Sequence, residues 1–133
     1  MALVIDASIA AVWFLPDEND ERADDILDRL NHENAVVPSL FWFEIRNILI
    51  KAHKRRRLNE TGLRKAIAHL RNLPLDDQGS GNDSLILSLC LKEGLTAYDA
   101  SYLALAMERG IPMVTADQAL EAAAARNGVK AIR

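Results

Sequence analysis

Residues 96–106 read Thr96-Ala-Tyr-Asp-Ala-Ser-Tyr-Leu-Ala-Leu-Ala106. Thr96 is a good N-cap residue, and Asp99, three positions later, can act as the acidic half of a capping box. The Ala and Leu residues that follow favour helix, and Tyr98, Tyr102 and Leu105 recur along one face at steps of four and three residues. The stretch therefore predicts a helix with an apolar face that carries Asp99 in its first turn.

On both sides of this helix, short apolar runs alternate with helical patterns. The predicted strands are residues 2–5, 35–37, 73–77, 112–115 and 129–132. The other predicted helices are residues 9–14, 19–32, 40–54, 58–73, 82–93 and a short Ala-rich segment opened by Asp117. Strands that alternate with helices imply a parallel sheet with helices on both faces and right-handed crossovers. The order of the strands does not follow from the sequence.

Two of these helices are expected to be hidden from solvent. Apolar residues surround nearly the whole of helix 40–54, so it should be buried or pack against a partner subunit. Helix 82–93 is also expected to be buried, and Ser39 is expected to cap the start of helix 40–54.

The composition is that of an ordinary globular chain. Of 133 residues, 50% are hydrophobic and 26% are charged, which argues against disorder and fits one domain over residues 1–133. No signal peptide is recognised, and no apolar run approaches the roughly 20 residues of a membrane span. Cys90 is the only cysteine, so an internal disulfide is excluded and a small buried apolar side chain is expected. We therefore expect a cytoplasmic protein without a membrane segment.

Charge is unevenly distributed along the chain, although the net charge is only −3. Residues 17–33 carry a balance of −6 and residues 51–65 a balance of +6. The acidic total argues mildly against nucleic-acid binding. The basic run can be a solvated helix face, or a rim that contacts an RNA backbone or an acidic part of a partner protein. Its candidate contact residues are Lys51, Lys54, Arg55, Arg56 and Arg57.

Four acids are expected to meet at one edge of the sheet. In an open parallel sheet, the loops at the carboxyl ends of the strands line the ligand crevice. Asp6 ends the first predicted strand, Asp117 follows the fourth, and Asp99 begins the helix that leads into the fourth. Glu44 lies among apolar neighbours near the start of its helix and can lean towards the same edge.

Each acid also has a purely structural interpretation. Asp6 and Asp117 can be N-caps, and Glu44 can pair with Arg46 or another surface base. As a group, however, four carboxylates repel one another and take up protons unless a cation compensates. Oxygen ligands without a second cysteine or a histidine cluster select a hard cation, Mg²⁺ or Mn²⁺, over zinc. Such an ion suits phosphoryl chemistry, so the residues predict metal-dependent phosphodiester hydrolysis.

Four motifs occur in order along the chain: Val4-Ile-Asp-Ala-Ser8, Phe43-Glu-Ile-Arg-Asn47, the stretch from Leu95 to Ala106, and Val114-Thr-Ala-Asp117. Together they resemble PIN-domain proteins, and among them the VapC-type toxins of type II toxin–antitoxin pairs. The resemblance covers the whole chain, and the four motifs in this order are specific.

The resemblance implies a three-layer α/β/α sandwich with a short-stranded, mainly parallel central sheet. It also implies a magnesium-dependent endoribonuclease in which Mn²⁺ could replace Mg²⁺. It implies that the catalytic and metal-binding residues are Asp6, Glu44, Asp99 and Asp117. Ser8, Asn47 and Thr115 match the supporting polar positions. The resemblance further implies a homodimer, an RNA substrate and a VapB-type antitoxin whose tail covers the active site.

Two other functions fit parts of the sequence. A receiver-type signalling domain needs a phosphoacceptor Asp on a central strand and a Lys at the end of a late strand. Asp76 and Asp77 precede a Gly-rich turn and Lys130 lies inside the last predicted strand, so the fit is poor. A PIN-fold regulator that binds nucleic acid together with its partner, with little or no nuclease activity, stays open.

Overall fold

The computed structural model of the protein describes residues 2–132. Its elements follow the order β1 (Leu3–Ile5), α1 (Ala7–Val12), α2 (Glu21–Arg29), β2 (Ala35–Val37), α3 (Leu40–Lys54), α4 (Glu60–Asn72), β3 (Leu75–Asp77), α5 (Asp83–Glu93), α6 (Ala97–Arg109), β4 (Met113–Val114) and α7 (Gln118–Arg126). The alternation of short strands with longer helices agrees with the sequence pattern.

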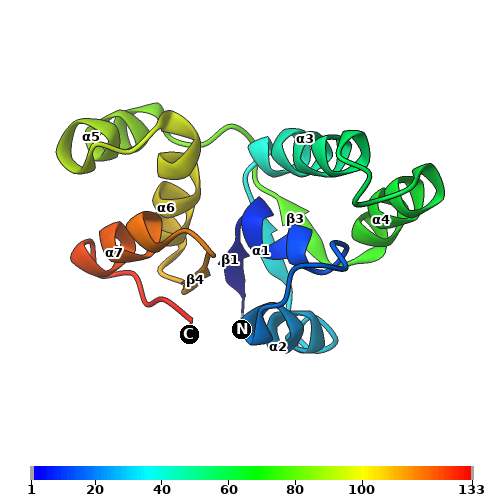
Figure 1. Ribbon diagram of the computed structural model, residues 1–133. Coiled ribbons are helices and arrows are strands. Elements are labelled where there is room, and N and C mark those ends of the chain that lie inside the picture. The colour runs from blue at the N-terminus through cyan, green and yellow to red at the C-terminus, as the bar shows by residue number, and fades with distance from the viewer. Residues whose placement is uncertain (1, 133) are drawn as a thin grey trace.

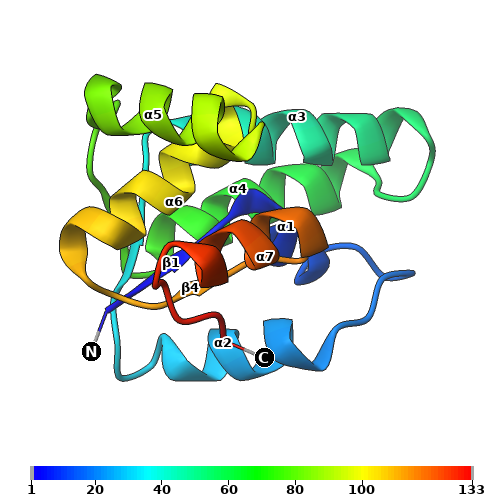
Figure 2. The same ribbon diagram turned by 90° about the vertical axis from the view of Figure 1, so that its left-hand side faces the viewer.

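The strands form one sheet in the order β3-β2-β1-β4, and every pair is parallel. β1 pairs with β2 on one side, with Leu3 opposite Ala35, and with β4 on the other, with Ile5 opposite Val114. Figure 1 shows α5, α6 and α7 on one side of the strands and α1, α3 and α4 on the other. In Figure 2, α2 lies below the strands and α5 and α6 lie above them. The predicted three-layer α/β/α sandwich with a short parallel sheet is confirmed.

The centre of the core is formed by β1 and β2, whose residues are apolar on both faces. Leu3, Val4 and Ile5 have no exposed surface, as expected for a parallel strand covered by helices on both sides. On α6, Tyr102 and Leu103 are also buried. The helix that carries Asp99 is therefore anchored in the core by its apolar face.

Side-chain caps fix most helix starts. The residue before the helix accepts a backbone N–H of the first turn through its side chain in six cases: Asp6, Asp20, Asn59, Asn82, Thr96 and Asp117. Because a capping residue marks the last position outside a helix, α2 begins at Glu21 and α4 at Glu60, each two residues later than predicted. By the same rule α1 begins at Ala7, two residues earlier than predicted.

Two local predictions are wrong. Ser39 precedes α3 but makes no capping hydrogen bond; its hydroxyl donates to Asp77 Oδ1 at 2.7 Å instead. Residues 129–132 form no strand, and Ala131 makes one isolated parallel bridge to Met113. Since β4 is only two residues long, it offers too short an edge for a longer ladder.

The helices α3 and α5 are less buried than predicted. Phe43 and Ile50 of α3 are 66% and 39% exposed, and Leu87 and Leu91 of α5 are 59% and 89% exposed. Cys90 is half-buried rather than buried. None of the helices within residues 2–132 is both long enough and apolar enough to cross a membrane. The structure thus leaves apolar side chains on its surface, and the prediction that α3 packs on a partner subunit stays a prediction.

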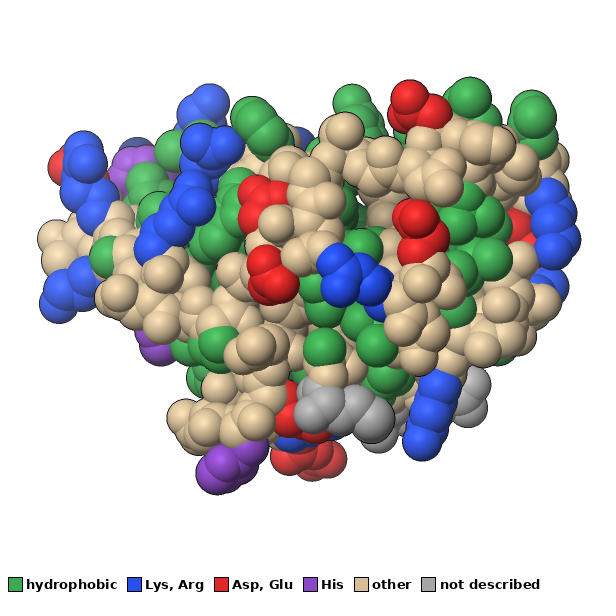
Figure 3. Space-filling view, turned by 180° about the vertical axis from the view of Figure 1, so that it is seen from behind, with side chains coloured by type: hydrophobic (Ala, Val, Ile, Leu, Met, Phe, Trp, Pro, Cys, Tyr) green, Lys and Arg blue, Asp and Glu red, His purple; other side chains and the backbone are tan. Residues whose placement is uncertain are grey.

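The acidic and basic runs are partly joined to each other. Arg57 Nη2 lies 2.7 Å from Asp17 Oδ1 and 3.3 Å from Glu18 Oε1, which ties the loop after α1 to the turn after α3. Within the acidic run, Asp20 is paired with Arg22. Figure 3 shows Lys and Arg side chains gathered at the end of the molecule that carries α3 and α4. The basic run is therefore neutralised at Arg57 and open to solvent over much of the rest.

The packing can be tested with two leucines of opposite exposure. Leu103 is fully buried and Leu91 is 89% exposed. Leu103→Ala leaves a cavity, so we expect the free energy of unfolding to fall by about 2–5 kcal/mol, whereas Leu91→Ala should change it by less than about 0.5 kcal/mol. Urea unfolding followed by circular dichroism, at two protein concentrations to separate self-association from packing, measures both. Equal losses would contradict the core described above.

Candidate active site

The candidate site lies where the order of the strands reverses. The chain runs from β1 to β2 and β3 on one side, and then returns to β4 on the other side of β1. In open α/β sheets, ligands bind outside the carboxyl ends of the strands at such a point. Asp6 follows β1 at this position, and Thr115 and Asp117 follow β4.

Asp6 is buried, and both oxygens of its carboxylate are hydrogen-bonded. Ser8 Oγ donates to Oδ1 at 2.6 Å, and the backbone N–H of Ile9 donates to the same oxygen at 3.2 Å. The Thr115 hydroxyl donates to Oδ2. Asp6 is therefore the N-cap of α1 and also the link between the end of β1 and the end of β4.

Asp117 is held relative to Asp6 through Ser8 and Thr115. The N–H of Ala116 donates to Ser8 Oγ at 3.1 Å, and the N–H of Asp117 donates to Thr115 Oγ1 at 3.0 Å. Asp117 Oδ1 accepts two N–H groups from the first turn of α7, at 2.9 and 3.1 Å. Capping uses only Oδ1, so the other oxygen has no partner within the described part of the chain.

Glu44 reaches the site from α3. Its Oε1 accepts a 2.6 Å hydrogen bond from the hydroxyl of Tyr102 on α6. The alternative pairing with Arg46 is wrong, because Arg46 Nε donates to the Trp42 carbonyl oxygen at 2.9 Å and the guanidinium lies 4.9 Å from the centre of the Phe43 ring. Glu44 is thus a half-buried carboxylate that forms no ion pair within residues 2–132.

Asp99 enters the site from the first turn of α6. Its N–H donates to Thr96 Oγ1 at 3.1 Å, which fixes the start of the helix. The helix packs against β1, so the half-buried carboxylate is held near the strand that Asp6 ends. A helix N-terminus also favours negative charge at this position.

Burial and the charge of neighbouring acids raise the pKa values of Asp6, Glu44 and Asp99. Burial raises the pKa of Asp6 above its usual value, its hydrogen bonds oppose this, and the charge of Asp99 adds to the rise. Burial also raises the pKa of Glu44, against the hydrogen bond from Tyr102 and with the charges of Asp6 and Asp99. For the raised pKa of Asp99, burial is the main cause and the charge of Asp117 comes next. The four carboxylates therefore lie close enough to repel, a situation that a bound cation relieves.

The available donors fit a hard divalent cation. All four side chains offer carboxylate oxygens, and no Lys, Arg or His among the described residues forms an ion pair with them. No three His, Cys, Asp or Glu side chains of residues 2–132 are arranged to hold an ion as they stand. Mg²⁺ keeps several waters and binds only one or two carboxylates directly. A loose group of carboxylates therefore suits Mg²⁺ better than a structural zinc ion, which needs a closed set of ligands.

The predicted supporting residues differ in their placement. Ser8 and Thr115 both bind Asp6. Asn47 lies on α3 one turn after Glu44 and is exposed, and its side chain makes no hydrogen bond to the acids within residues 2–132. The chemical roles of these residues stay predictions.

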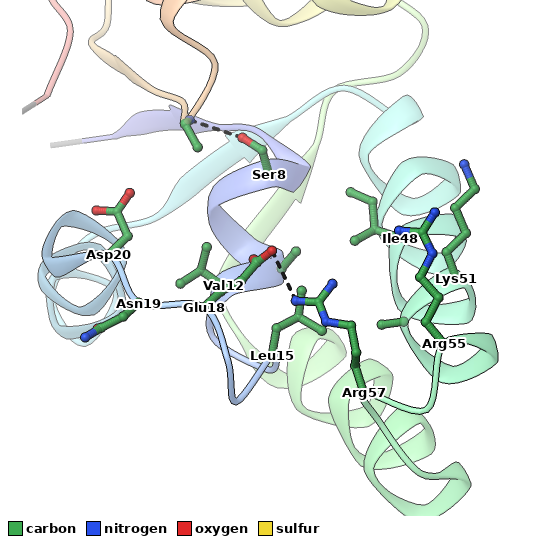
Figure 4. A pocket seen from close by; sticks show the side chains of 13 residues that line it. Ser8, Val12, Leu15, Glu18, Asn19, Asp20, Ile48, Lys51, Arg55 and Arg57 are labelled. Carbon is green, nitrogen blue, oxygen red and sulfur yellow. Dashed lines mark hydrogen bonds and ion pairs between the residues drawn. The ribbon is translucent and has the colours of Figure 1, made fainter.

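A groove of about 500 Å³ opens beside the site, between α1, the loop after it and α3 (Figure 4). Ser8 and Ala116, which belong to the hydrogen-bond network around Asp6, line one end of it. Three of the five bases predicted to contact RNA or a partner also line this groove: Lys51, Arg55 and Arg57. The other two bases do not.

Tyr102 is the residue that sequence reasoning missed. Its place on the apolar face of α6 predicted packing alone, and the ring is indeed only 1% exposed. Its hydroxyl, however, binds Glu44. Burial, together with the hydrogen bond to Glu44 and the charge of that residue, holds the pKa of Tyr102 far above its usual range, so the hydroxyl stays a donor. The signal in the sequence was Glu44 itself, since a carboxylate on an apolar helix needs a partner.

The sequence of the chain matches a known family and a known relative. Residues 3–126 match the family described as PIN domain. Ribonuclease VapC3 of Pyrobaculum aerophilum is 30% identical over 124 residues, which is 90% of this chain and 92% of the relative.

Solved structures with this fold are similar over nearly the whole chain. A protein from Pyrobaculum aerophilum superposes with a TM-score of 0.71 at 21% identity, over 98% of this chain and 83% of the other. VapBC2 from Rickettsia felis, bound to a promoter DNA fragment, superposes with a TM-score of 0.69 at 15% identity. The match covers 99% of this chain and 98% of the other. A toxin–antitoxin complex from Klebsiella pneumoniae gives 0.62 at 18% identity, over 90% of each chain.

These likenesses agree with the geometry of the site. The structural matches, all below 25% identity, support the fold. The match over residues 3–126 and the relative at 30% identity identify the family. This chain belongs to the PIN-domain family, among its VapC-type members.

Proposed function

We propose that this protein is a magnesium-dependent endoribonuclease that serves as the toxin of a toxin–antitoxin pair. The observation that carries the proposal is the group of mutually repelling carboxylates, without basic partners among the described residues, at the point where the sheet order reverses. The VapC-type relative is named a ribonuclease, which supports RNA as the substrate.

Asp6, Asp99 and Asp117 would hold Mg²⁺, directly or through water, with Glu44 as a further ligand or as the residue that orients water; Mn²⁺ could replace Mg²⁺. When bound, such an ion neutralises charge on the phosphate and the leaving oxygen and makes a bound water more acidic. The chain supplies placement. Ser8 and Thr115 lock the carboxylate of Asp6, and the N-terminus of α6 offsets part of the cost of negative charge at Asp99.

Glu44 is proposed to orient the attacking water and to accept its proton. Because the Tyr102 hydroxyl occupies Oε1, Oε2 is left for the water. Burial raises the pKa of Glu44 towards neutral pH, where a general base is most effective. The water oxygen bonds to phosphorus, the bond from phosphorus to the 3′ oxygen breaks, and that oxygen takes up a proton. The products carry a 3′ hydroxyl and a 5′ phosphate.

We also propose that the protein forms a homodimer and binds a VapB-type antitoxin. The exposed apolar side chains Phe43, Leu87, Leu91 and Tyr98 suit burial by a second copy, since large contiguous apolar patches mark interaction surfaces. A structure of this fold from Klebsiella pneumoniae is a toxin–antitoxin complex, which supports an antitoxin as partner.

A second candidate is a regulator that binds DNA together with its partner. The observation in its favour is the Rickettsia felis structure, in which VapBC2 is bound to a promoter DNA fragment. Assaying the purified toxin–antitoxin pair on both nucleic acids, and the freed toxin on RNA, separates the two functions. Tight sequence-specific DNA binding without cleavage of any RNA would favour the regulator.

The proposed chemistry predicts the effect of removing one carboxylate. Asp99→Asn keeps the size of the side chain and the cap by Thr96. Mutation of residues outside the ligand shell typically costs 10–100-fold in metal affinity or activity, so losing a ligand should lower kcat/KM for RNA by about 100-fold or more. The matched control is Asp25→Asn on the exposed side of α2. Initial rates on a quenched fluorescent RNA over a magnesium series measure both, and full activity of Asp99→Asn would remove this residue from the site.

The raised pKa of Asp99 predicts how the stability of the metal-free protein depends on pH, and the Asp99→Asn variant tests this. The pKa of Asp99 is raised in the folded state, so the folded chain holds the proton more readily than the unfolded chain. The charged carboxylate therefore destabilises the fold at neutral pH, and this effect disappears as the pH falls through the folded pKa towards the ordinary value of 3.8. In EDTA at neutral pH, Asp99→Asn should melt above the unsubstituted protein, with the gap closing in acid. A lower melting temperature at neutral pH would contradict the repulsion described above.

The hydrogen bond from Tyr102 predicts a shift in the pH–rate profile. Tyr102→Phe removes the donor that lowers the pKa of Glu44, so the acid limb of kcat should move to higher pH and kcat should fall about 10-fold, as for other residues outside the ligand shell. The control is Tyr98→Phe on the same helix, whose ring is 62% exposed. A loss of activity without a shift of the acid limb would assign Tyr102 to packing alone.

A further inference from the structure

One end of the groove adjoins the candidate site, and one of its walls is basic. Ser8 and Ala116 line the end that meets the Asp6 network. The middle is lined by small and aliphatic side chains of α1 and α3, among them Val12 and Ile48. Lys51, on the last turn of α3, and Arg55, which caps the C-terminal end of that helix, line one wall of the groove four residues apart, and Figure 4 shows them following one another along that wall. A ligand in the groove therefore lies beside the hydrogen-bond network of Asp6 at one end and has two cations along its side.

The charge that the groove offers to a ligand is positive. Its two acidic lining residues are already bound, Glu18 by Arg57 at 3.3 Å and Asp20 by Arg22 at 3.2 Å. Arg57 is in turn held by Asp17 and Glu18. Lys51 and Arg55, in contrast, form no ion pair or side-chain hydrogen bond within residues 2–132. The two uncompensated charges in the groove thus both lie at the C-terminal end of α3.

We propose that this groove holds the phosphodiester backbone of the RNA strand next to the cleaved bond, with Lys51 and Arg55 contacting neighbouring phosphates. The proposal rests on the ribonuclease function above and assigns the path of its substrate. Two cations four residues apart at the C-terminal end of α3 form a line that suits the regular charge of a strand, and Arg55 can bind a phosphate through two N–H groups. A volume of about 500 Å³ has room for a short piece of single strand.

The composition of the groove also indicates that it does not recognise the bases of the RNA. Its described lining contains no aromatic side chain, and stacking on aromatic rings is the common way to hold unpaired bases. Contacts to phosphates position a strand without carrying sequence information. The groove therefore anchors the RNA strand. Recognition of the sequence that is cleaved has to come from residues outside the groove.

The test measures binding apart from cleavage. Lys51→Gln/Arg55→Gln removes both groove cations, and the matched control Lys65→Gln/Arg109→Gln removes an exposed Lys from α4 and an exposed Arg from α6 that do not line the groove. Fluorescence anisotropy of a labelled oligouridylate in EDTA gives the binding constant over a potassium chloride series. For single strands, each lost phosphate contact makes the slope of log K against log [salt] shallower by about 0.7. We expect a change of about 1.4 for the groove variant, with a fall in affinity of at least about 10-fold, and an unchanged slope for the control.

Two results would overturn the proposal. Equal changes in both double variants would show that the cations act only through the overall charge of the surface. An unchanged RNA slope together with lost binding of the purified antitoxin would assign the groove to an acidic protein segment. Cleavage of the same RNA with Mg²⁺ is measured in parallel: absence of cleavage by the unsubstituted protein counts against the ribonuclease function, whereas the slopes in EDTA report on the groove alone.

Discussion

The site depends on one buried carboxylate that joins two strand ends. A buried carboxylate is costly unless its oxygens are hydrogen-bonded, and Asp6 receives donors from Ser8, Ile9 and Thr115. The strands it joins are three and two residues long, so the sheet itself contributes few hydrogen bonds here. The same contacts that hold β4 to β1 therefore also place the acids, and a change in one changes the other.

Helix capping and construction of the site use the same local geometry. Asp117 caps α7 through one oxygen and keeps the other free within the described chain. Thr96 caps α6 and thereby orients Asp99. The interpretation of Asp6 and Asp117 as N-caps is thus correct and compatible with a chemical role. What a cap does not explain is Glu44, which lies inside a helix and receives its hydrogen bond from a different helix.

The features of this structure that depend on burial and on chain direction could be predicted from the sequence. Apolar runs and helical periods predicted the parallel sheet and its two helix layers, and parallel strands brought Asp6 and Asp117 to one edge. The order of the strands could not be predicted from the sequence, because it depends on how the crossovers connect distant segments. The contact between Tyr102 and Glu44 was missed because the sequence does not show how α3 and α6 face each other. The exposure of Leu91 was missed because periodicity rules assign every apolar side chain to an interior.

The hydrogen bond between Thr115 and Asp6 joins residues 109 positions apart in a chain of 133. The chain is synthesised from its N-terminal end at about 5–20 residues per second, so Asp6, Glu44 and Asp99 are made before the strand that completes their surroundings. A nascent chain that stops before β4 carries three of the four acids and lacks the donor that locks the first. The group of four carboxylates is therefore complete only after β4 and Asp117 have been synthesised.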